Sequence, residues 1–275
     1  MNILLFIDNL TTAEQVTKLL LGLDYPVETK ITLLTIYENE KDQFQLENIL
    51  NDVKRDLSVK YLHIQTDLQP GHVIEKLIEE SSTHAYDFIV TGTEIHQGHF
   101  HFRNDSFPRK LSREINLPLL IARNVPEKIE KILFCTSAEA PSLDTLRIAG
   151  RLLSGLKVEF GLLHVMSQLA LRPDSLPDDL LDTAESAIQR NTREGLQLVK
   201  GMQILASTGI DSKITPCLRH GLVIDQVLIE IEEGTYDLVV IGEHYRHGLN
   251  RWLEVLLDDV AGQLLIQSPR SILII

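Results

Sequence analysis

The sequence predicts an α/β protein of two tandem domains, each built on an open parallel sheet with helices on both faces. Two observations predict this fold. The segment that begins Tyr86-Asp87 returns in the second half as Tyr236-Asp237, and short apolar runs alternate with helical patterns throughout. A repeat of roughly 130 to 150 residues is too long for a solenoid unit. It therefore indicates two copies of one whole fold.

In the first half, five strand-like runs alternate with four helical patterns. Val73, Ile74, Leu77 and Ile78 share one face of the third helical pattern. Near-continuous apolar strands alternating with helices are typical of a parallel sheet covered on both faces. The expected strands are residues 3–8, 31–36, 59–66, 87–91 and 117–122, and the expected helices are residues 12–21, 42–56, 73–84 and 106–115.

The second half repeats this order with one enlarged segment. Apolar and small residues recur at steps of three or four from Leu181 to Met202. They predict one long helix, ending near Gly209, whose apolar stripe packs on its own sheet or binds a partner. The expected strands are residues 131–136, 158–164, 213–217, 238–241 and 271–275.

A short junction at residues 124–128, which contains Pro126, divides the chain into expected domains 1–126 and 127–275. Domains joined by so short a linker should pack against each other. The terminal strands, residues 117–122 and 271–275, are apolar, and an open strand edge invites association. We expect them to pair within the chain or with a second chain, as in a homodimer.

Composition excludes several classes of protein. The chain has 26 Lys and Arg against 39 Asp and Glu, a formal charge of -13, which repels nucleic acid and anionic lipid. Cys135 and Cys217 are its only cysteines, too few for a disulfide framework, so a reducing cytoplasm is the expected compartment. Apolar runs do not reach the roughly 20 residues of a membrane helix, and the first residues do not resemble a signal peptide.

In open parallel sheets, ligands bind at the carboxyl ends of the strands where the strand order reverses. With the first strand central, that crevice lies between the first and fourth strands. The residues to consider are therefore Asp8-Asn9 with residues 91–106 in the first copy, and Ser137-Ala138 with residues 242–259 in the second.

Several motifs occur in the same order in both copies. They are the Ile-Leu-Leu-Phe-Ile-Asp opening, Gly71 and Gly221 before the third helix, the Tyr-Asp-hydrophobic-Val-Thr/Ile-Gly pattern, and the closing apolar runs. Over nearly its whole length the chain thus resembles the universal stress protein family, as a tandem member. The resemblance implies adenine nucleotide alpha hydrolase-like sheets of order 3-2-1-4-5 and pairing of domains through their last strands.

Members of that family that bind ATP carry Gly-x2-Gly-x9-Gly-Ser/Thr after the fourth strand and an acidic residue after the first. Glycines let backbone N–H groups approach phosphates, and a hydroxyl at a helix N-terminus completes the anion site. Ile95 and Asp105 stand where the second and third glycines belong. The residues that the resemblance assigns to nucleotide in the first domain are Asp8, Gly92, Gly98 and Ser106.

The carboxylate of Asp105 would repel a bound triphosphate. Two unit charges about 4 Å apart repel by roughly 4 kcal/mol at an effective dielectric constant near 20. Magnesium would offset part of this repulsion. We therefore expect the first domain to bind no ATP, with binding of AMP or of ATP with Mg as the alternative.

The second copy departs further from the family motif. Ser137 stands where the acid belongs, Gly242 is kept, and Tyr245 replaces the next glycine. The closing Gly-Ser is replaced by Val255-Leu256 or, with a longer spacing, by Asp258-Asp259. We expect no triphosphate binding in this domain.

Other chemistry-bearing residues are interpreted structurally. We expect solvated histidines in the loops that hold His96, His99 and His101 and, in the second copy, His244 and His247, with zinc binding or pH sensing as alternatives. Both cysteines are expected to be packed thiols, and His164 a packed residue at a strand end. Glu79-Glu80 and Glu232-Glu233 are placed on the solvated face of the third helix of each copy.

The sequence contains no Gly-x-Ser-x-Gly elbow, Walker motif or His-Glu-x-x-His motif. The expected function is therefore a non-enzymatic tandem universal stress protein that acts in the stress response through protein contacts. The alternative is an adenine-nucleotide sensor in which only the first domain binds.

Overall fold

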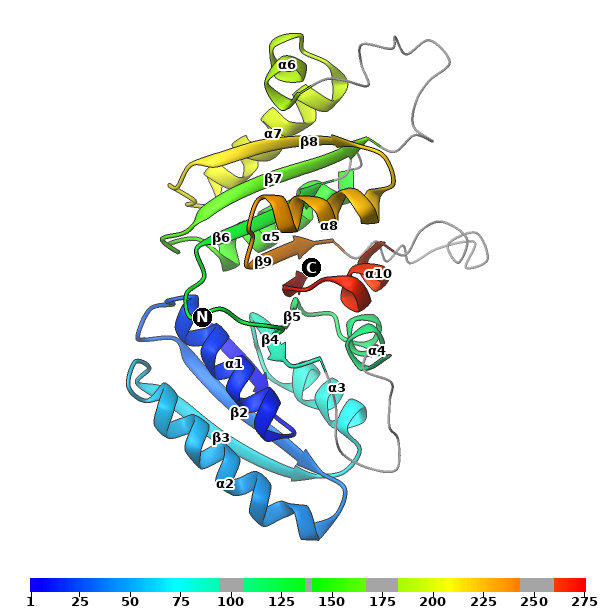
Figure 1. Cartoon of the computed structure of the whole chain (residues 1–275). Coiled ribbons are helices and arrows are strands. Elements are labelled where there is room, and N and C mark those ends of the chain that lie inside the picture. The colour runs from blue at the N-terminus through cyan, green and yellow to red at the C-terminus, as the bar shows by residue number, and fades with distance from the viewer. Residues whose placement is uncertain (94–105, 137–139, 167–182, 243–259) are drawn as a thin grey trace. The chain divides into compact units, whose positions relative to one another are not determined.

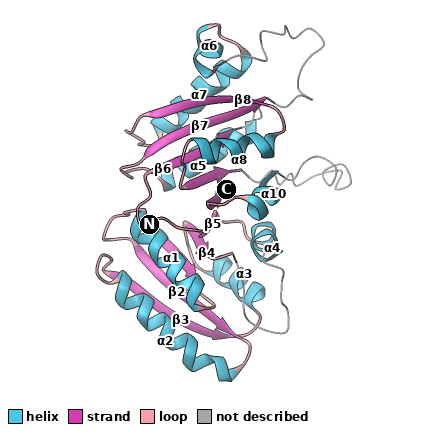
Figure 2. Ribbon diagram, in the orientation of Figure 1, coloured by secondary structure: helices cyan, strands magenta, loops and turns pink. Residues whose placement is uncertain are grey.

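The structure, a computed structural model, describes residues 1–93, 106–136, 140–166, 183–242 and 260–275. The chain divides by its contacts into two compact units. One consists of Met1–Ile129 with Pro269–Leu273, and the other of Glu130–Ser268 with Ile274–Ile275. Both units are α/β, with helices packed on parallel strands (Figures 1 and 2).

In the first unit β1 is central and the strand order is β3-β2-β1-β4-β5, all parallel. Ile3, Leu4 and Leu5 of β1 are fully buried because helices cover both faces of the sheet. Helices α1 and α2 lie side by side (Figure 1). The elements are β1 (Asn2–Phe6), α1 (Leu10–Gly22), β2 (Lys30–Tyr37), α2 (Glu40–Leu57), β3 (His63–Pro70), α3 (Val73–Thr83), β4 (Phe88–Thr91), α4 (Ser106–Glu114) and β5 (Leu119–Ile121).

The second half of the chain repeats the topology, with β6 central and the order β8-β7-β6-β9-β10. Strand β6 pairs in parallel with β7 and β9, and β7 pairs in parallel with β8. Ile132, Leu133 and Phe134 of β6 are fully buried. The predicted fold class and strand order are thus confirmed. The elements are β6 (Lys131–Thr136), α5 (Ala140–Leu152), β7 (Glu159–Met166), α6 (Ala184–Gln189), α7 (Arg193–Ser207), β8 (Ile214–His220), α8 (Val223–Glu233), β9 (Leu238–Ile241), α10 (Val260–Gln267) and β10 (Ser271–Ile274).

The prediction of one long helix from Leu181 to near Gly209 was wrong, because the described part forms two helices, α6 and α7. Asn191 between them has a positive φ of 53°, which ends α6. The Thr192 side chain then accepts a hydrogen bond from the Gly195 N–H at 3.1 Å and caps α7. A Cβ on Gly195 would lie 2.1 Å from the Ala187 carbonyl oxygen, so the two helices meet through this glycine.

The strand expected at residues 59–66 begins later, at His63. Val59 and Leu62 belong to a turn after α2, in which the Lys60 N–H donates to the Leu57 carbonyl oxygen. Tyr61 anchors this turn: its ring is buried and its hydroxyl donates to the Leu20 carbonyl oxygen at 2.8 Å. The apolar residues Val59 and Leu62 therefore extended the predicted strand, although they lie in the turn before it.

Gly71 and Gly221 both have a φ of 137°, a backbone conformation that residues with a side chain rarely adopt. Each lies between an edge strand and the helix that follows it. Their recurrence in the sequence is therefore explained by backbone geometry. None of the helices in the described parts of the chain is both long enough and apolar enough to cross a membrane.

Candidate functional site

The carboxyl ends of β1 and β4 carry the residues that the sequence assigned to a ligand. Asn9 caps α1, because its side chain accepts a hydrogen bond from the Thr12 N–H at 2.8 Å. Asp8 is buried, and its Oδ1 atom accepts from the Thr12 hydroxyl at 2.9 Å and from the Asn9 amide at 2.8 Å. This carboxylate oxygen therefore stabilises the first turn of α1.

Gly92, directly after β4, lies against the same threonine. A Cβ on Gly92 would stand 2.8 Å from the Thr12 hydroxyl oxygen and 3.1 Å from its methyl carbon. The glycine thus allows α1 to approach the end of β4. Thr12 joins Asp8 and Gly92, and sequence reasoning missed it because the contact depends on how α1 packs on the sheet.

A cavity of about 220 Å³ opens beside these residues at the ends of β4 and β5. Its lining includes the backbone of Gly92 and several polar side chains, whereas Asp8 is not part of it. Gly98, Ile95 and Asp105 lie outside the described residues. Ser106 begins α4. The other residues that line the cavity are Asn9, Thr11, Thr12, Gln15, Thr93, Ala122, Arg123 and Asn124.

The second unit has the same glycine contact. A Cβ on Gly242, after β9, would stand 2.4 Å from the hydroxyl oxygen of Thr145, a buried residue of α5. The remaining positions of its motif, Ser137, Tyr245 and residues 255–259, lie outside the described part of the chain. In both units, then, the glycine that opens the motif packs on a threonine of the first helix.

The model of the universal stress protein family matches residues 128–275, more than half of the chain. The chain belongs to this family. No curated protein sequence matches it.

Solved structures share the universal stress protein fold over both units. A universal stress protein from Archaeoglobus fulgidus DSM 4304 is 15% identical, with a TM-score of 0.65, covering 99% of this chain and 95% of that one. A functionally unknown protein from Pseudomonas aeruginosa PAO1 is 15% identical, with a TM-score of 0.61 and 100% and 92% covered. The cytoplasmic domain of a prokaryotic cation chloride cotransporter is 12% identical, with a TM-score of 0.57 and 99% and 94% covered.

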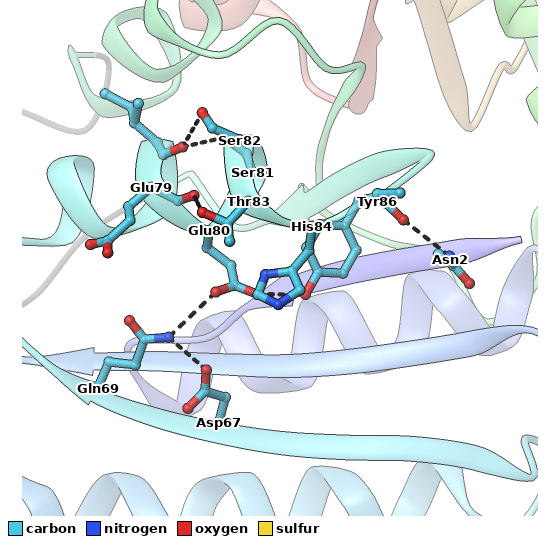
Figure 3. A network of polar contacts seen from close by, with 12 residues as sticks. Asn2, Asp67, Gln69, Glu79, Glu80, Ser81, Ser82, Thr83, His84 and Tyr86 are labelled. Carbon is cyan, nitrogen blue, oxygen red and sulfur yellow. Dashed lines mark hydrogen bonds and ion pairs between the residues drawn. The ribbon is translucent and has the colours of Figure 1, made fainter.

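A polar cluster lies under α3 in the first unit of this universal stress protein, and Figure 3 shows it. Glu80 is buried, so its predicted place on a solvated face was wrong, whereas Glu79 is exposed. The Tyr86 hydroxyl donates to Glu80 Oε1 at 2.6 Å, and His84 Nδ1 lies 3.1 Å from the same atom. The Gln69 amide donates to Glu80 Oε2 at 3.4 Å and to Asp67 at 2.6 Å.

The second unit keeps the glutamate and gives it a cationic partner. Counting from Gly71 and Gly221, Arg219 replaces Gln69, and Glu230 matches Glu80. Glu230 is buried, and the Arg219 Nε donates to its Oε2 at 2.6 Å, while the Arg219 Nη2 donates to exposed Glu233. Exposed Glu232 and Glu233 agree with the prediction for that pair.

The aspartate of the repeated Tyr-Asp pair holds the first strand of each unit. Asp87 Oδ2 accepts a hydrogen bond from the Asn2 N–H at 2.7 Å. Asp237 Oδ2 accepts from the N–H groups of Glu130 and Lys131 at 2.8 and 3.1 Å. In the first unit, the tyrosine of the pair, Tyr86, donates to buried Glu80. The repeated Tyr-Asp pair therefore has a structural explanation.

Both cysteines are half-buried free thiols in the described structure. Burial raises the pKa of Cys135 to about 12 and that of Cys217 to about 11, which suppresses the reactive thiolate. His164 is buried, its Nδ1 lies 3.2 Å from the Thr136 carbonyl oxygen, and burial lowers its pKa. The described residues contain no group of three or more His, Cys, Asp or Glu that could hold a metal ion. The His-rich loops, with His96 and His244, lie outside them.

Proposed function

We propose that this chain acts in the stress response through protein contacts, as a non-enzymatic tandem protein that binds no nucleoside triphosphate. Membership of the universal stress protein family supports the stress-response role. The observation that carries the proposal is the packing of Gly92 on Thr12 and of Gly242 on Thr145. In both units, the close contact between this glycine and a threonine of the first helix explains why a glycine is present without invoking a phosphate.

The acidic residue expected to face a nucleoside is likewise engaged within the fold. Asp8 accepts hydrogen bonds from Thr12 and Asn9, and it does not line the neighbouring cavity. That cavity, about 220 Å³, is smaller than the roughly 300 to 1,000 Å³ of ordinary ligand pockets. In the sequence, Asp105 adds a negative charge where the family places a glycine beside phosphate.

Protein contacts fit the remaining features. The chain carries a net charge of -13, which favours partners other than nucleic acid or anionic membranes. The last strands, residues 117–122 and 271–275, are apolar and suit pairing within the chain and in a homodimer. Two free cysteines suit a cytoplasmic location.

A nucleotide assay on purified protein tests the proposal. We expect heat denaturation to release no nucleotide and calorimetry to detect no binding of ATP with Mg. A variant with Ile95→Gly and Asp105→Gly, which restores the family motif, should gain affinity and shows that the assay can detect binding. Stoichiometric release of ATP from the wild-type chain would refute the proposal.

A second candidate is an AMP sensor confined to the first unit. The cavity beside Gly92 favours it, since it lies at the predicted end of the sheet and is lined by Asn9 and Arg123. AMP brings fewer charges to Asp105 than ATP does. Binding of AMP that is lost in Arg123→Ala, while ATP binds more weakly, would support this candidate over the first.

A further inference from the structure

Three apolar side chains stand exposed at the amino ends of the strands of the first unit. They are Val27, Val59 and Leu62, with exposed fractions of 43%, 88% and 72%. Val27 belongs to the loop between α1 and β2, and the other two belong to the turn between α2 and β3. We call these three residues the amino-end patch. Both segments are drawn at the end of the sheet where the N label lies (Figure 1).

The structure holds the two segments of the patch together. The Leu62 N–H donates to the Val27 carbonyl oxygen at 3.1 Å. Lys60 Nζ lies 2.5 Å from Asp24 Oδ1, which is a second link between the turn and the loop. Buried Tyr61, between Lys60 and Leu62, fixes the turn on α1. The apolar side chains are therefore presented by an anchored surface.

The second unit shows that the fold does not require these exposed side chains. Strand pairing makes Ile31 and Ile64 equivalent to Phe160 and Ile214. Counting back along each chain segment, Leu62 matches Ser212, Val59 matches Gly209, and Val27 matches Leu156, which is only 6% exposed. The same place in the repeated fold thus carries a serine, a glycine and a buried leucine in one unit, and three exposed apolar side chains in the other.

The patch is also locally neutral on a strongly acidic chain. Residues 24–30 and 58–63 contain two acidic residues, Asp24 and Glu28, and two basic residues, Lys30 and Lys60. Two copies of a chain with a net charge of -13 repel each other, and the repulsion is weakest where the surface charge cancels. Glu28 and Lys30 are exposed, so each copy offers both signs of charge to the other.

We propose that a second copy of this chain docks on the amino-end patch and that the two patches pack on each other. Apolar surface meets apolar surface across a two-fold axis, and the exposed charges at its rim are self-complementary. Three side chains cover far less than the roughly 800 Å² per partner of a standard interface, so the association is weak and reversible. The proposal rests on the patch alone and does not depend on nucleotide binding.

Sedimentation equilibrium of the full chain tests it. The wild type should show a concentration-dependent mass between monomer and dimer over about 1 to 500 µM. A variant with Val59→Ser and Leu62→Ser should associate at least about tenfold more weakly, because two apolar side chains are lost from each copy. The control is Leu222→Ser, since Leu222 is 65% exposed in the second unit and should leave association unchanged.

Either of two results would overturn the proposal. One is a wild type that remains monomeric over the whole concentration range. The other is a dimer that persists undiminished in the doubly substituted variant, which would place the interface elsewhere, for example on the last strands. Circular dichroism of each variant checks that its fold is retained. Neither result bears on the absence of ATP binding, which the nucleotide assay decides separately.

Discussion

The two units surround the same buried glutamate with different chemistry. In the first, the neighbours of Glu80 are a phenol, an amide and the His84 imidazole. In the second, the Arg219 guanidinium bonds Glu230 directly. A guanidinium is charged at every pH that proteins meet, so the second unit compensates its buried carboxylate permanently. The repeat therefore conserves the glutamate's place in the fold but not how its charge is balanced.

A second pair of positions differs in the same way. Thr35 of β2 donates its hydroxyl to the Ile7 carbonyl oxygen at 2.6 Å. By strand register, His164 of β7 is its equivalent, and its Nδ1 lies 3.2 Å from the Thr136 carbonyl oxygen. One backbone carbonyl is thus satisfied by a group that does not titrate near neutrality, and the other by one that does.

The largest expected effect comes from removing the cation of the second cluster. Arg219→Met leaves Glu230 buried without its cation and should lower the stability of the second unit by about 3 kcal/mol, the low end for a broken buried ion pair. The low end applies because the Arg219 side chain keeps 21% exposure. Hydrogen exchange of the β8 and α8 amides measures the loss locally, which suits a chain of two units.

The matched change in the first unit is Gln69→Met, which removes a neutral donor 3.4 Å from Glu80 and 2.6 Å from Asp67 and should cost about 1 kcal/mol. Arg219→Gln should recover part of the loss, because it restores the donor that the first unit uses. Equal destabilisation by Arg219→Met and Gln69→Met would contradict the distinction between the two clusters.

The reciprocal substitution sharpens the comparison with a smaller effect. Gln69→Arg brings a cation beside Glu80 and Asp67 and should stabilise the first unit by about 1 kcal/mol, measured by hydrogen exchange of β3 and α3. Lys76→Arg, on an exposed i,i+3 pair with Glu79, is the control and should change little. Destabilisation by Gln69→Arg would contradict the claim that a cation at this position stabilises the buried cluster.

The sequence was sufficient for the fold class, the strand order implied by the family resemblance, and most elements. The prediction of a single long helix failed because periodicity was weighted above a local signal: Thr192 followed by the acidic Glu194 is typical of a helix start. Glu80 was misplaced although it continues the stripe of Val73 and Leu77, because charge was weighted above periodicity. Thr12 and Thr145 were out of reach, since their contacts with Gly92 and Gly242 arise only when helix and sheet pack.

The smallest expected effect is a pH dependence confined to the second unit. Burial lowers the pKa of His164 below its unfolded value of 6.5, and Glu194, Arg193 and His220 also face it. The unfolded chain then binds more protons, so the stability contributed by neutral His164 is complete above pH 6.5 and falls as the pH drops toward the folded pKa.

We therefore expect the amides of β6 and β7 to exchange faster, after correction for intrinsic rates, when the pH falls from 7 to 5, whereas those of β1 and β2 keep their protection. His164→Thr copies the first unit and should remove most of this dependence. The remainder belongs to His220, whose pKa is also lowered by burial. An equal acid response in β1 and β2, where Thr35 holds the equivalent carbonyl, would assign the effect to charge repulsion over the whole chain instead of to His164.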